Sequence, residues 1–177
     1  MRPWTDGRKG RRALAANRPG GVVALRTVCK AHGVTLCYLF GSQSENAWRI
    51  LLGEEIAIDD PLTDIDVGVV LAEFDSYRAS NVLYRVYARL LSPLEDLFHP
   101  YPVDLVFLQE HHSVFQMEAI SGRSVYSVSD EYRFEYEEEI ARRAADFRPV
   151  LYAYFEDVAE GFRESYTISG GVVRDAE

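Results

Sequence analysis

The chain of 177 residues is 47% apolar and 12% aromatic, which predicts one compact domain with a buried core. Its formal charge of -9 argues against nucleic acid as the main partner, because binding to phosphates needs clustered Lys and Arg. The sequence has neither an apolar run long enough to span a membrane nor a signal-peptide pattern, so we expect a cytoplasmic protein.

Residues 1–19 differ from the rest of the chain in charge. They contain six Lys or Arg residues and a single acidic residue, Asp6. Short charged termini are commonly disordered, so we expect a flexible basic arm here, with contact to an acidic partner or a nucleotide phosphate as the alternative. The folded domain is predicted over residues 20–163.

The first half of the folded domain predicts alternating helices and strands. Apolar spacing and chain-breaking glycines indicate helices over residues 21–32 and 43–52 and strands over residues 34–40 and 64–70. Gly33 is well placed to end the first helix, and Gly41-Ser42 ends the first strand. The second strand begins with alternating acidic and apolar residues and then becomes wholly apolar.

The second half contains the remaining elements. The pattern indicates helices over residues 80–91, 113–121 and 131–162 and strands over residues 103–108 and 123–128. Ser92-Pro93 is expected to end the first of these helices, and Pro149 to break the last. Residues 164–177 are expected to form a flexible tail, because they offer little apolar surface to anchor them.

Three aspartates lie in strands that are otherwise apolar. Asp64 and Asp66 are two residues apart, so they project from one face of their strand, and Asp104 lies in the next predicted strand. If the two strands are neighbours, the carboxylates converge. Mg²⁺ prefers carboxylate oxygens and completes its coordination with substrate phosphates, so this cluster predicts a metal site that acts on a nucleotide.

Gly41-Ser42 supplies the second half of such a site. A glycine after a strand lets a phosphate approach the backbone, and the start of the following helix offers free N–H groups. Alone, a Gly-Ser pair or an Asp-x-Asp pair is weak evidence, because turns and caps also produce them. The ordered combination with a later strand aspartate is far more specific.

This combination resembles the minimal nucleotidyltransferases, which are relatives of DNA polymerase β. The matching segments are Tyr38-Leu39-Phe40-Gly41-Ser42, Thr63-Asp64-Ile65-Asp66-Val67 and Val103-Asp104-Leu105-Val106. The resemblance covers about residues 22–160, and its later part looks like the antitoxin-type members. It implies an α+β (α/β) nucleotidyltransferase fold, with a short mixed β-sheet flanked by helices and with C-terminal helices.

The resemblance also implies roles for these residues. Asp64, Asp66 and Asp104 would be catalytic and would hold two Mg²⁺ ions, while Gly41 and Ser42 would bind the phosphates of ATP. The leading hypothesis is transfer of AMP to a tyrosine of a partner HEPN-type toxin, with this chain as the antitoxin. The alternatives are a small-molecule nucleotidyltransferase similar to aminoglycoside-modifying enzymes, and a catalytically silent module that binds its partner.

Two departures from the family pattern concern the segment after Ser42. The family usually places about ten residues between the serine and the first aspartate, whereas 21 residues separate Ser42 from Asp64 here. Glu45 also lies where a negative charge near phosphate is unhelpful, unless it points outward or caps the helix. Access to the site or the choice of substrate is therefore expected to differ.

Overall fold

The computed structural model describes residues 20–60 and 63–169. The predicted basic arm over residues 1–19 lies outside the described residues, as do residues 170–177 of the predicted tail. The first residues of that predicted tail, 164–169, belong to the last helix. None of the described helices is long and apolar enough to cross a membrane.

A four-stranded mixed sheet forms the centre of the domain. Its strands lie in the order β3-β2-β1-β4 and cover β1 Val34–Phe40, β2 Ile65–Leu71, β3 Val103–Phe107 and β4 Arg123–Ser127. β1 is antiparallel to both β2 and β4, whereas β2 and β3 are parallel. The structure therefore confirms the predicted mixed sheet.

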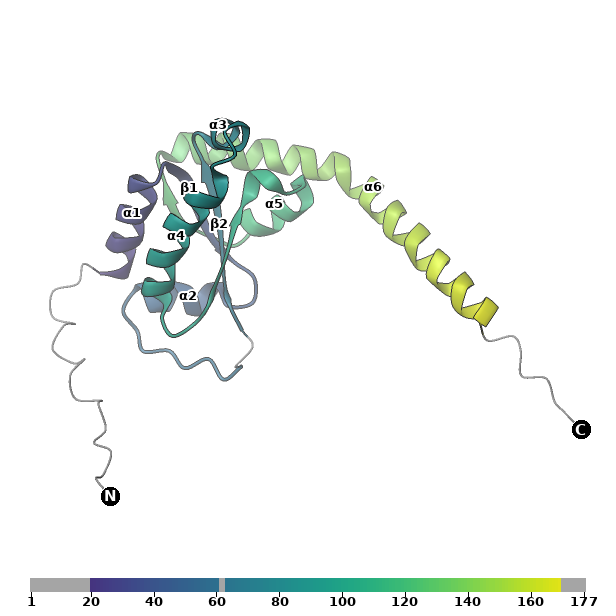
Figure 1. Ribbon diagram of the computed structural model, residues 1–177, viewed down its shortest axis with the longest axis horizontal. Coiled ribbons are helices and arrows are strands. Elements are labelled where there is room, and N and C mark those ends of the chain that lie inside the picture. The colour runs from purple at the N-terminus through teal and green to yellow at the C-terminus, as the bar shows by residue number, and fades with distance from the viewer. Residues whose placement is uncertain (1–19, 61–62, 170–177) are drawn as a thin grey trace, which may run out of the picture.

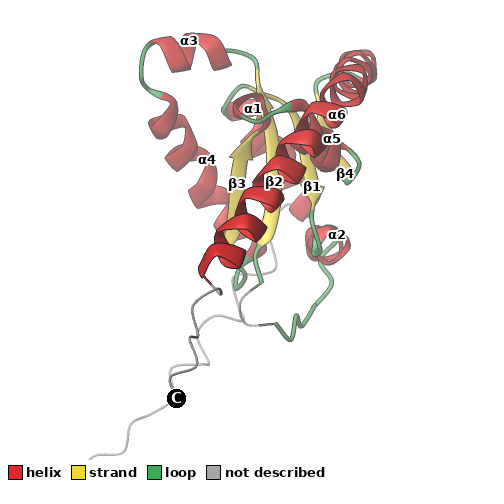
Figure 2. Ribbon diagram, turned by 90° about the vertical axis from the view of Figure 1, so that its right-hand side faces the viewer, coloured by secondary structure: helices red, strands yellow, loops and turns green. Residues whose placement is uncertain are grey.

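Helices cover both faces of the sheet (Figures 1 and 2). One face carries α1 (Gly21–Ala31), α2 (Ser44–Leu51) and α4 (Leu83–Phe98), and the other carries α5 (Ser113–Ile120) and α6 (Asp130–Ser169). The short helix α3 (Phe74–Ala79) links β2 to α4. Figure 2 shows α5 and α6 in front of the sheet, with α1 behind it.

Strand alternation divides the interior into two cores. Cys37 and Leu39 of β1 point into the larger core beneath α1 and α4, where the free cysteine Cys29 is also buried. Tyr38 and Phe40 point into the smaller core beneath α5. Because β2 and β3 alternate in the same way, their even-numbered residues face α5, and this is the face that receives the acidic side chains.

The prediction that Ser92-Pro93 ends a helix is wrong. The predicted helix over residues 80–91 corresponds to α4, which begins at Leu83 and continues through Pro93 to Phe98, and the short helix α3 before it was not predicted. Leu90, Leu94 and Phe98 are all buried and recur every four residues, so the helix keeps its apolar stripe on both sides of the proline. Burial of this stripe offsets the hydrogen bond that Pro93 cannot make.

The predicted break of the last helix takes the form of a bend. α6 is continuous from Asp130 to Ser169 and includes Pro149. Figure 1 shows that it changes direction partway along and that its far end projects away from the sheet. A proline inside a helix removes one backbone hydrogen bond and kinks the axis, so a bend without a break is a regular outcome.

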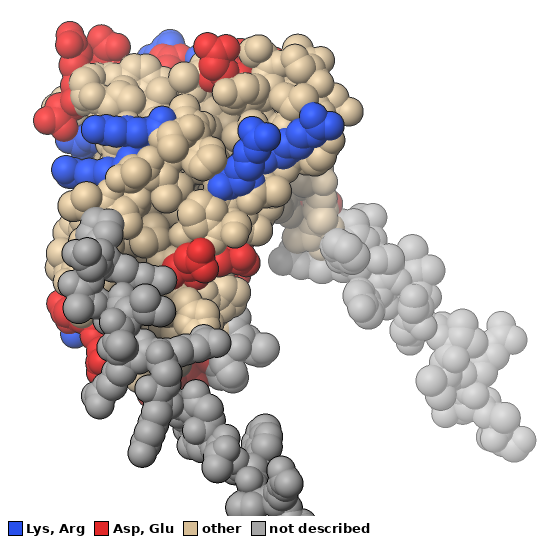
Figure 3. Space-filling view, turned by 60° about the vertical axis from the view of Figure 1, so that its left-hand side comes forward, with Lys and Arg blue, Asp and Glu red and all other residues tan. Residues whose placement is uncertain are grey.

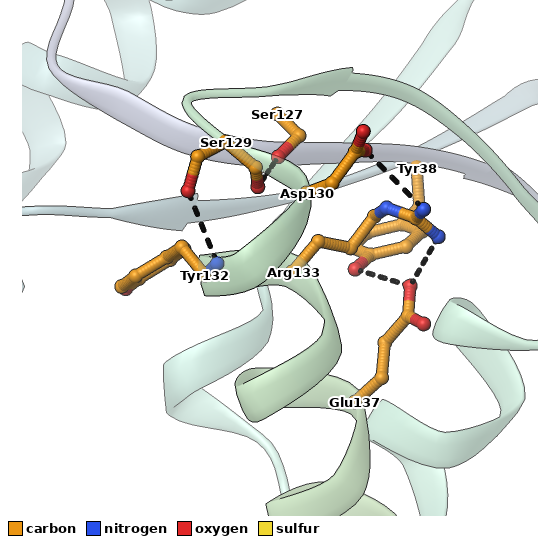
Figure 4. A network of polar contacts seen from close by, with 7 residues as sticks. All are labelled: Tyr38, Ser127, Ser129, Asp130, Tyr132, Arg133 and Glu137. Atoms are coloured by element: carbon orange, nitrogen blue, oxygen red, sulfur yellow. Dashed lines mark hydrogen bonds and ion pairs between the residues drawn. The ribbon is translucent and has the colours of Figure 1, made fainter.

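A polar network attaches α6 to the middle of the sheet (Figure 4). The wholly buried Tyr38 donates its hydroxyl to Glu137 Oε1 at 3.0 Å, and Arg133 Nη1 lies 3.4 Å from the same oxygen. Burial, followed by the charge of Glu137, raises the pKa of Tyr38, so the phenol stays protonated and donates. The network therefore fixes α6 over the second core.

We expect Tyr38→Phe to lower the free energy of unfolding by about 1 kcal/mol, because it removes one buried hydrogen bond without changing the packing volume. Urea denaturation of both proteins measures the difference. Tyr84→Phe is the matched control, since Tyr84 is 60% exposed on α4. An equal effect of the two substitutions would show that the Glu137 contact does not hold α6 in place.

Candidate active site

The turn between β1 and α2 depends on Gly41. Its φ of +67° lies in the left-handed region that favours glycine. A Cβ atom at this position would also collide with the carboxylate of Asp66, because Phe40 and Asp66 are paired in the sheet. Gly41 therefore allows the backbone of the turn to lie directly against the Asp66 side chain.

Beyond Gly41, the chain presents polar groups at the start of α2. Ser42 is exposed, and Gln43, the residue before the helix, makes no side-chain cap to it. Gln43 instead accepts a hydrogen bond from the Asn46 side chain at 2.8 Å. The Ser44 N–H donates to the Gly41 carbonyl at 3.5 Å, whereas the N–H groups of Glu45 and Asn46 have no side-chain cap from Gln43 and can receive an anion.

The three predicted aspartates meet at the ends of β2 and β3 nearest this turn. Asp66 and Asp104 are register partners on these parallel strands, and Asp64 lies two residues before Asp66. Asp64 and Asp104 are exposed, whereas Asp66 is half-buried. The structure therefore brings the predicted carboxylates to one end of the sheet, on the face of β2 and β3 that α5 covers.

The electrostatics of this cluster centre on Asp66. Burial raises the pKa of Asp66, and the negative charges of Asp64, Asp104 and Glu118 raise it further. Glu118 lies on α5 and was not predicted, because only the packing of α5 over the sheet brings it near. Four acidic groups, from the start of β2, from β3 and from α5, consequently create a region of negative electrostatic potential.

The chemistry of this donor set suits a hard divalent cation. Carboxylate oxygens are the ligands that Mg²⁺ prefers, and a cation would relieve the repulsion that raises the pKa of Asp66. Among residues 20–60 and 63–169, however, no three His, Cys, Asp or Glu side chains are grouped so that they could hold a metal ion. The carboxylates repel one another electrostatically, but they are not arranged as a complete set of metal ligands.

Arg123 lies beside the turn and was missed by the sequence analysis. Its Nη2 lies 2.7 Å from Glu45 Oε2, and its guanidinium stacks over the Trp48 ring, with its carbon 5.1 Å from the ring centroid. Gly122 allows the chain before Arg123 to lie directly against β1, because a Cβ atom at Gly122 would collide with the Leu39 carbonyl. The charge of Glu45, expected to be unhelpful near phosphate, is thus paired with a cation.

The enlarged segment between α2 and β2 is tied to the chain just before β3. The Tyr101 hydroxyl donates to the Ile56 carbonyl at 2.8 Å and accepts from the Ile58 N–H at 3.0 Å. Ile58 also packs against the larger core. The part of the insertion that the structure describes is therefore anchored three residues from Asp104, with residues 61–62 lying outside the described ranges.

A strand, a Gly-Ser turn, a helix and two neighbouring acidic strands together define the nucleotidyltransferase class of fold. The family model described as polymerase beta, nucleotidyltransferase matches residues 24–131. The chain belongs to this family. No curated protein matches the sequence significantly.

Solved structures with the same fold include those of MntA-type antitoxins in complexes with HEPN toxins. A mutant MntA–HpeT complex matches with 17% identity and a TM-score of 0.54, over 78% of this chain and 98% of that chain. A toxin–antitoxin complex with AMP-PNP matches with 18% identity and a TM-score of 0.53, over the same shares. A tri-AMPylated HEPN toxin of Shewanella oneidensis with its MNT antitoxin matches with 17% identity and a TM-score of 0.52, over 78% and 96%.

We expect Asp66→Asn to stabilise the metal-free protein at pH 7 by about 0.5–1 kcal/mol, because it removes one charge from a repelling cluster. The raised pKa of Asp66 means that the folded state holds this proton more tightly than the unfolded chain. The tighter binding of this proton stabilises the folded state fully below the unfolded-state pKa of about 3.9. The stabilisation is lost as the pH rises through the raised pKa of Asp66 in the folded state. The gain from Asp66→Asn should accordingly shrink as pH falls.

Thermal unfolding in EDTA from pH 3 to pH 8 measures this difference. Asp59→Asn is the control, because Asp59 is an exposed acidic residue of the loop before β2. A loss of stability for Asp66→Asn at pH 7 would mean that the carboxylate is held by favourable contacts and is not repelled by its neighbours.

Proposed function

We propose that this protein is a metal-dependent nucleotidyltransferase that transfers AMP from ATP to a tyrosine hydroxyl of a partner HEPN-type toxin, and that it acts as the antitoxin. One observation carries the proposal: Asp66, register partner of Asp104, lies against Gly41 of the turn that precedes α2. Acidic groups for cations and N–H groups for phosphates are thereby adjacent.

The reaction is an exchange of one oxygen for another at the α-phosphorus. The acceptor hydroxyl oxygen forms a new bond to the α-phosphorus, the bond from this phosphorus to the bridging oxygen of the β-phosphate breaks, and pyrophosphate leaves. The proton of the hydroxyl passes to the carboxylate of Asp104. Ser42 and the backbone at Gly41 bind the departing phosphates through hydrogen bonds.

Asp64, Asp66 and Asp104 are the residues that would hold two Mg²⁺ ions. Bound there, the ions would neutralise charge around phosphorus and keep the attacking and leaving oxygens in line. The repulsion that raises the pKa of Asp66 fits this role, since a site that assembles unneutralised carboxylates favours a cation as its counter-charge.

The matched solved structures and the charge of this chain support a protein acceptor. The matched structures include one with AMP-PNP and one in which a HEPN toxin is tri-AMPylated in complex with its MNT antitoxin. The formal charge of -9 also complements a basic partner, because opposite potentials steer association. Both features favour a protein acceptor over a small molecule.

A catalytically silent module that masks its partner by contact is the second candidate. It is favoured by the lack of a metal-holding group among the described residues and by the enlarged segment that Tyr101 anchors near Asp104. The two candidates predict opposite results for labelling with ATP, so one experiment separates them.

We expect the protein to label a co-expressed and co-purified HEPN-type toxin with ATP that carries ³²P in the α-phosphate, but not with ATP labelled in the γ-phosphate. EDTA should abolish labelling. Asp64→Asn/Asp66→Asn should reduce the rate at least about 100-fold, because charge stabilisation around phosphorus is lost. Gel autoradiography and the mass of the toxin measure the transfer.

The matched control is Asp75→Asn/Asp96→Asn, which removes two acidic residues exposed on α3 and α4 and should leave the rate unchanged. Labelling from the γ-phosphate would show that the protein transfers a phosphoryl group and not a nucleotidyl group. No labelling by a well-folded protein, together with tight toxin binding, would establish the silent module instead.

A further inference from the structure

The helices on the face of the sheet away from Asp66 carry a concentration of basic side chains. α1 contains Arg26 and Lys30 and no acidic residue. α4, which packs against α1, carries Arg85 and Arg89 in its first half, and its acidic residues come only in its second half. We call these four residues, all exposed, the basic face.

Figure 3 turns the left-hand side of Figure 1, which holds α1 and α4, toward the viewer. Lys and Arg side chains form two groups in the upper part of the visible surface, with uncharged residues between them, and Asp and Glu side chains lie mainly above and below these groups. In a protein with a formal charge of -9, this local excess of positive charge is opposite to the total.

Within the described part of the chain, the basic face makes no ion pair. Arg85 donates to its neighbour Tyr84 at 2.8 Å and stacks over that ring, but no described carboxylate contacts any of the four cations. On α6, by contrast, Arg142 and Arg143 are both paired with Glu139. Four charges on this surface are therefore available to an external anion.

The spacing of these cations is unfavourable for the isolated protein. Arg26 and Lys30 are four residues apart on α1, and Arg85 and Arg89 are four residues apart on α4. Like charges at this spacing lie on the same side of a helix and destabilise it. Phosphate groups of a chain-like anion bound at each pair would reduce this repulsion.

The basic face also contains a hollow. A cavity of about 370 Å³ lies between the end of α1, α3 and α4, and Arg85, Arg89, His32 and Tyr77 are among its lining residues. Tyr84, the neighbour of Arg85 on α4, is 60% exposed and lines a separate hollow. Arginine forks bind phosphate oxygens in pairs, and exposed aromatic rings stack on nucleic-acid bases.

We propose that the basic face binds the phosphodiester backbone of a single-stranded nucleic acid. Arginines dominate the face, and tyrosines lie among them, which is the combination that holds a strand by phosphate contacts and base stacking. The acidic groups elsewhere on the folded domain repel a polyanion and favour its binding at this surface. The whole-chain charge that argues against nucleic acid conceals this local site.

The site is separate from the proposed transfer reaction. Asp66 and Asp104 project toward α5, whereas α1 and α4 cover the opposite face of the sheet. Nucleic acid bound to α1 and α4 therefore leaves the carboxylate cluster exposed to its own substrate. Binding can be measured in EDTA and without ATP, so its result is independent of whether the protein transfers AMP.

The test is fluorescence anisotropy of the full chain with a labelled 20-nucleotide RNA and a DNA of the same sequence, over a series of salt concentrations in EDTA. We expect Arg85→Gln/Arg89→Gln to weaken binding at least about tenfold. It should also reduce the slope of log K against log salt by about 1.4, since each single-strand phosphate contact contributes about 0.7. Comparison of the two oligonucleotides shows whether the face prefers RNA or DNA.

The matched control is Arg142→Gln/Arg143→Gln, which removes the same charge from α6, where both arginines are paired with Glu139. Residues 1–19 carry six further Lys or Arg in every variant, so only the difference between variants reports on the basic face. Thermal unfolding verifies that the variants remain folded.

Three results would overturn the proposal. They are no saturable binding of either oligonucleotide near 50 mM salt, an equal loss in the α6 control, and tighter binding of poly-glutamate of matched charge than of either oligonucleotide. The last result would reassign the basic face to an acidic protein segment.

Discussion

The contact between Gly41 and Asp66 is the constraint on which the rest of the site depends. A turn with a left-handed residue lies directly against a half-buried carboxylate, and only the absence of a Cβ atom makes this approach possible. The sheet register then adds Asp104 beside Asp66, and α5 adds Glu118 above it. The fold thus concentrates negative charge where an uncapped helix start offers N–H groups, which suits a nucleotide with its cations.

The same sheet separates two kinds of electrostatic surface. Alternation along β2 sends Asp66 toward α5 and the apolar Val67 toward α1 and α4, so the carboxylates of the site lie on the α5 side of the sheet. The outer surfaces of α1 and α4 are left free to carry unpaired cations. An overall charge of -9 consequently describes neither surface, and each has its own chemistry.

Local patterns predicted the strands and the aspartates, because alternation over a few residues determines which side chains share a face. The helix through Pro93 could not be predicted, since burial of Leu94 and Phe98 against other elements outweighs the local effect of proline. Glu118 and Arg123 were missed for a related reason. Glu118 and Arg123 reach the site only because α5 and β4 pack against the other elements. Local sequence patterns do not predict such long-range contacts.

The most direct test of the nucleotidyltransferase assignment is calorimetric titration of the protein with AMP-PNP and Mg²⁺. The wild type should bind the nucleotide in the presence of Mg²⁺, and Asp64→Asn/Asp66→Asn should lose this binding while keeping its fold. Failure of the well-folded wild type to bind would contradict the account, as would binding that the double variant retains in full. Either result would mean that the cluster around Asp66 is not a nucleotide and metal site.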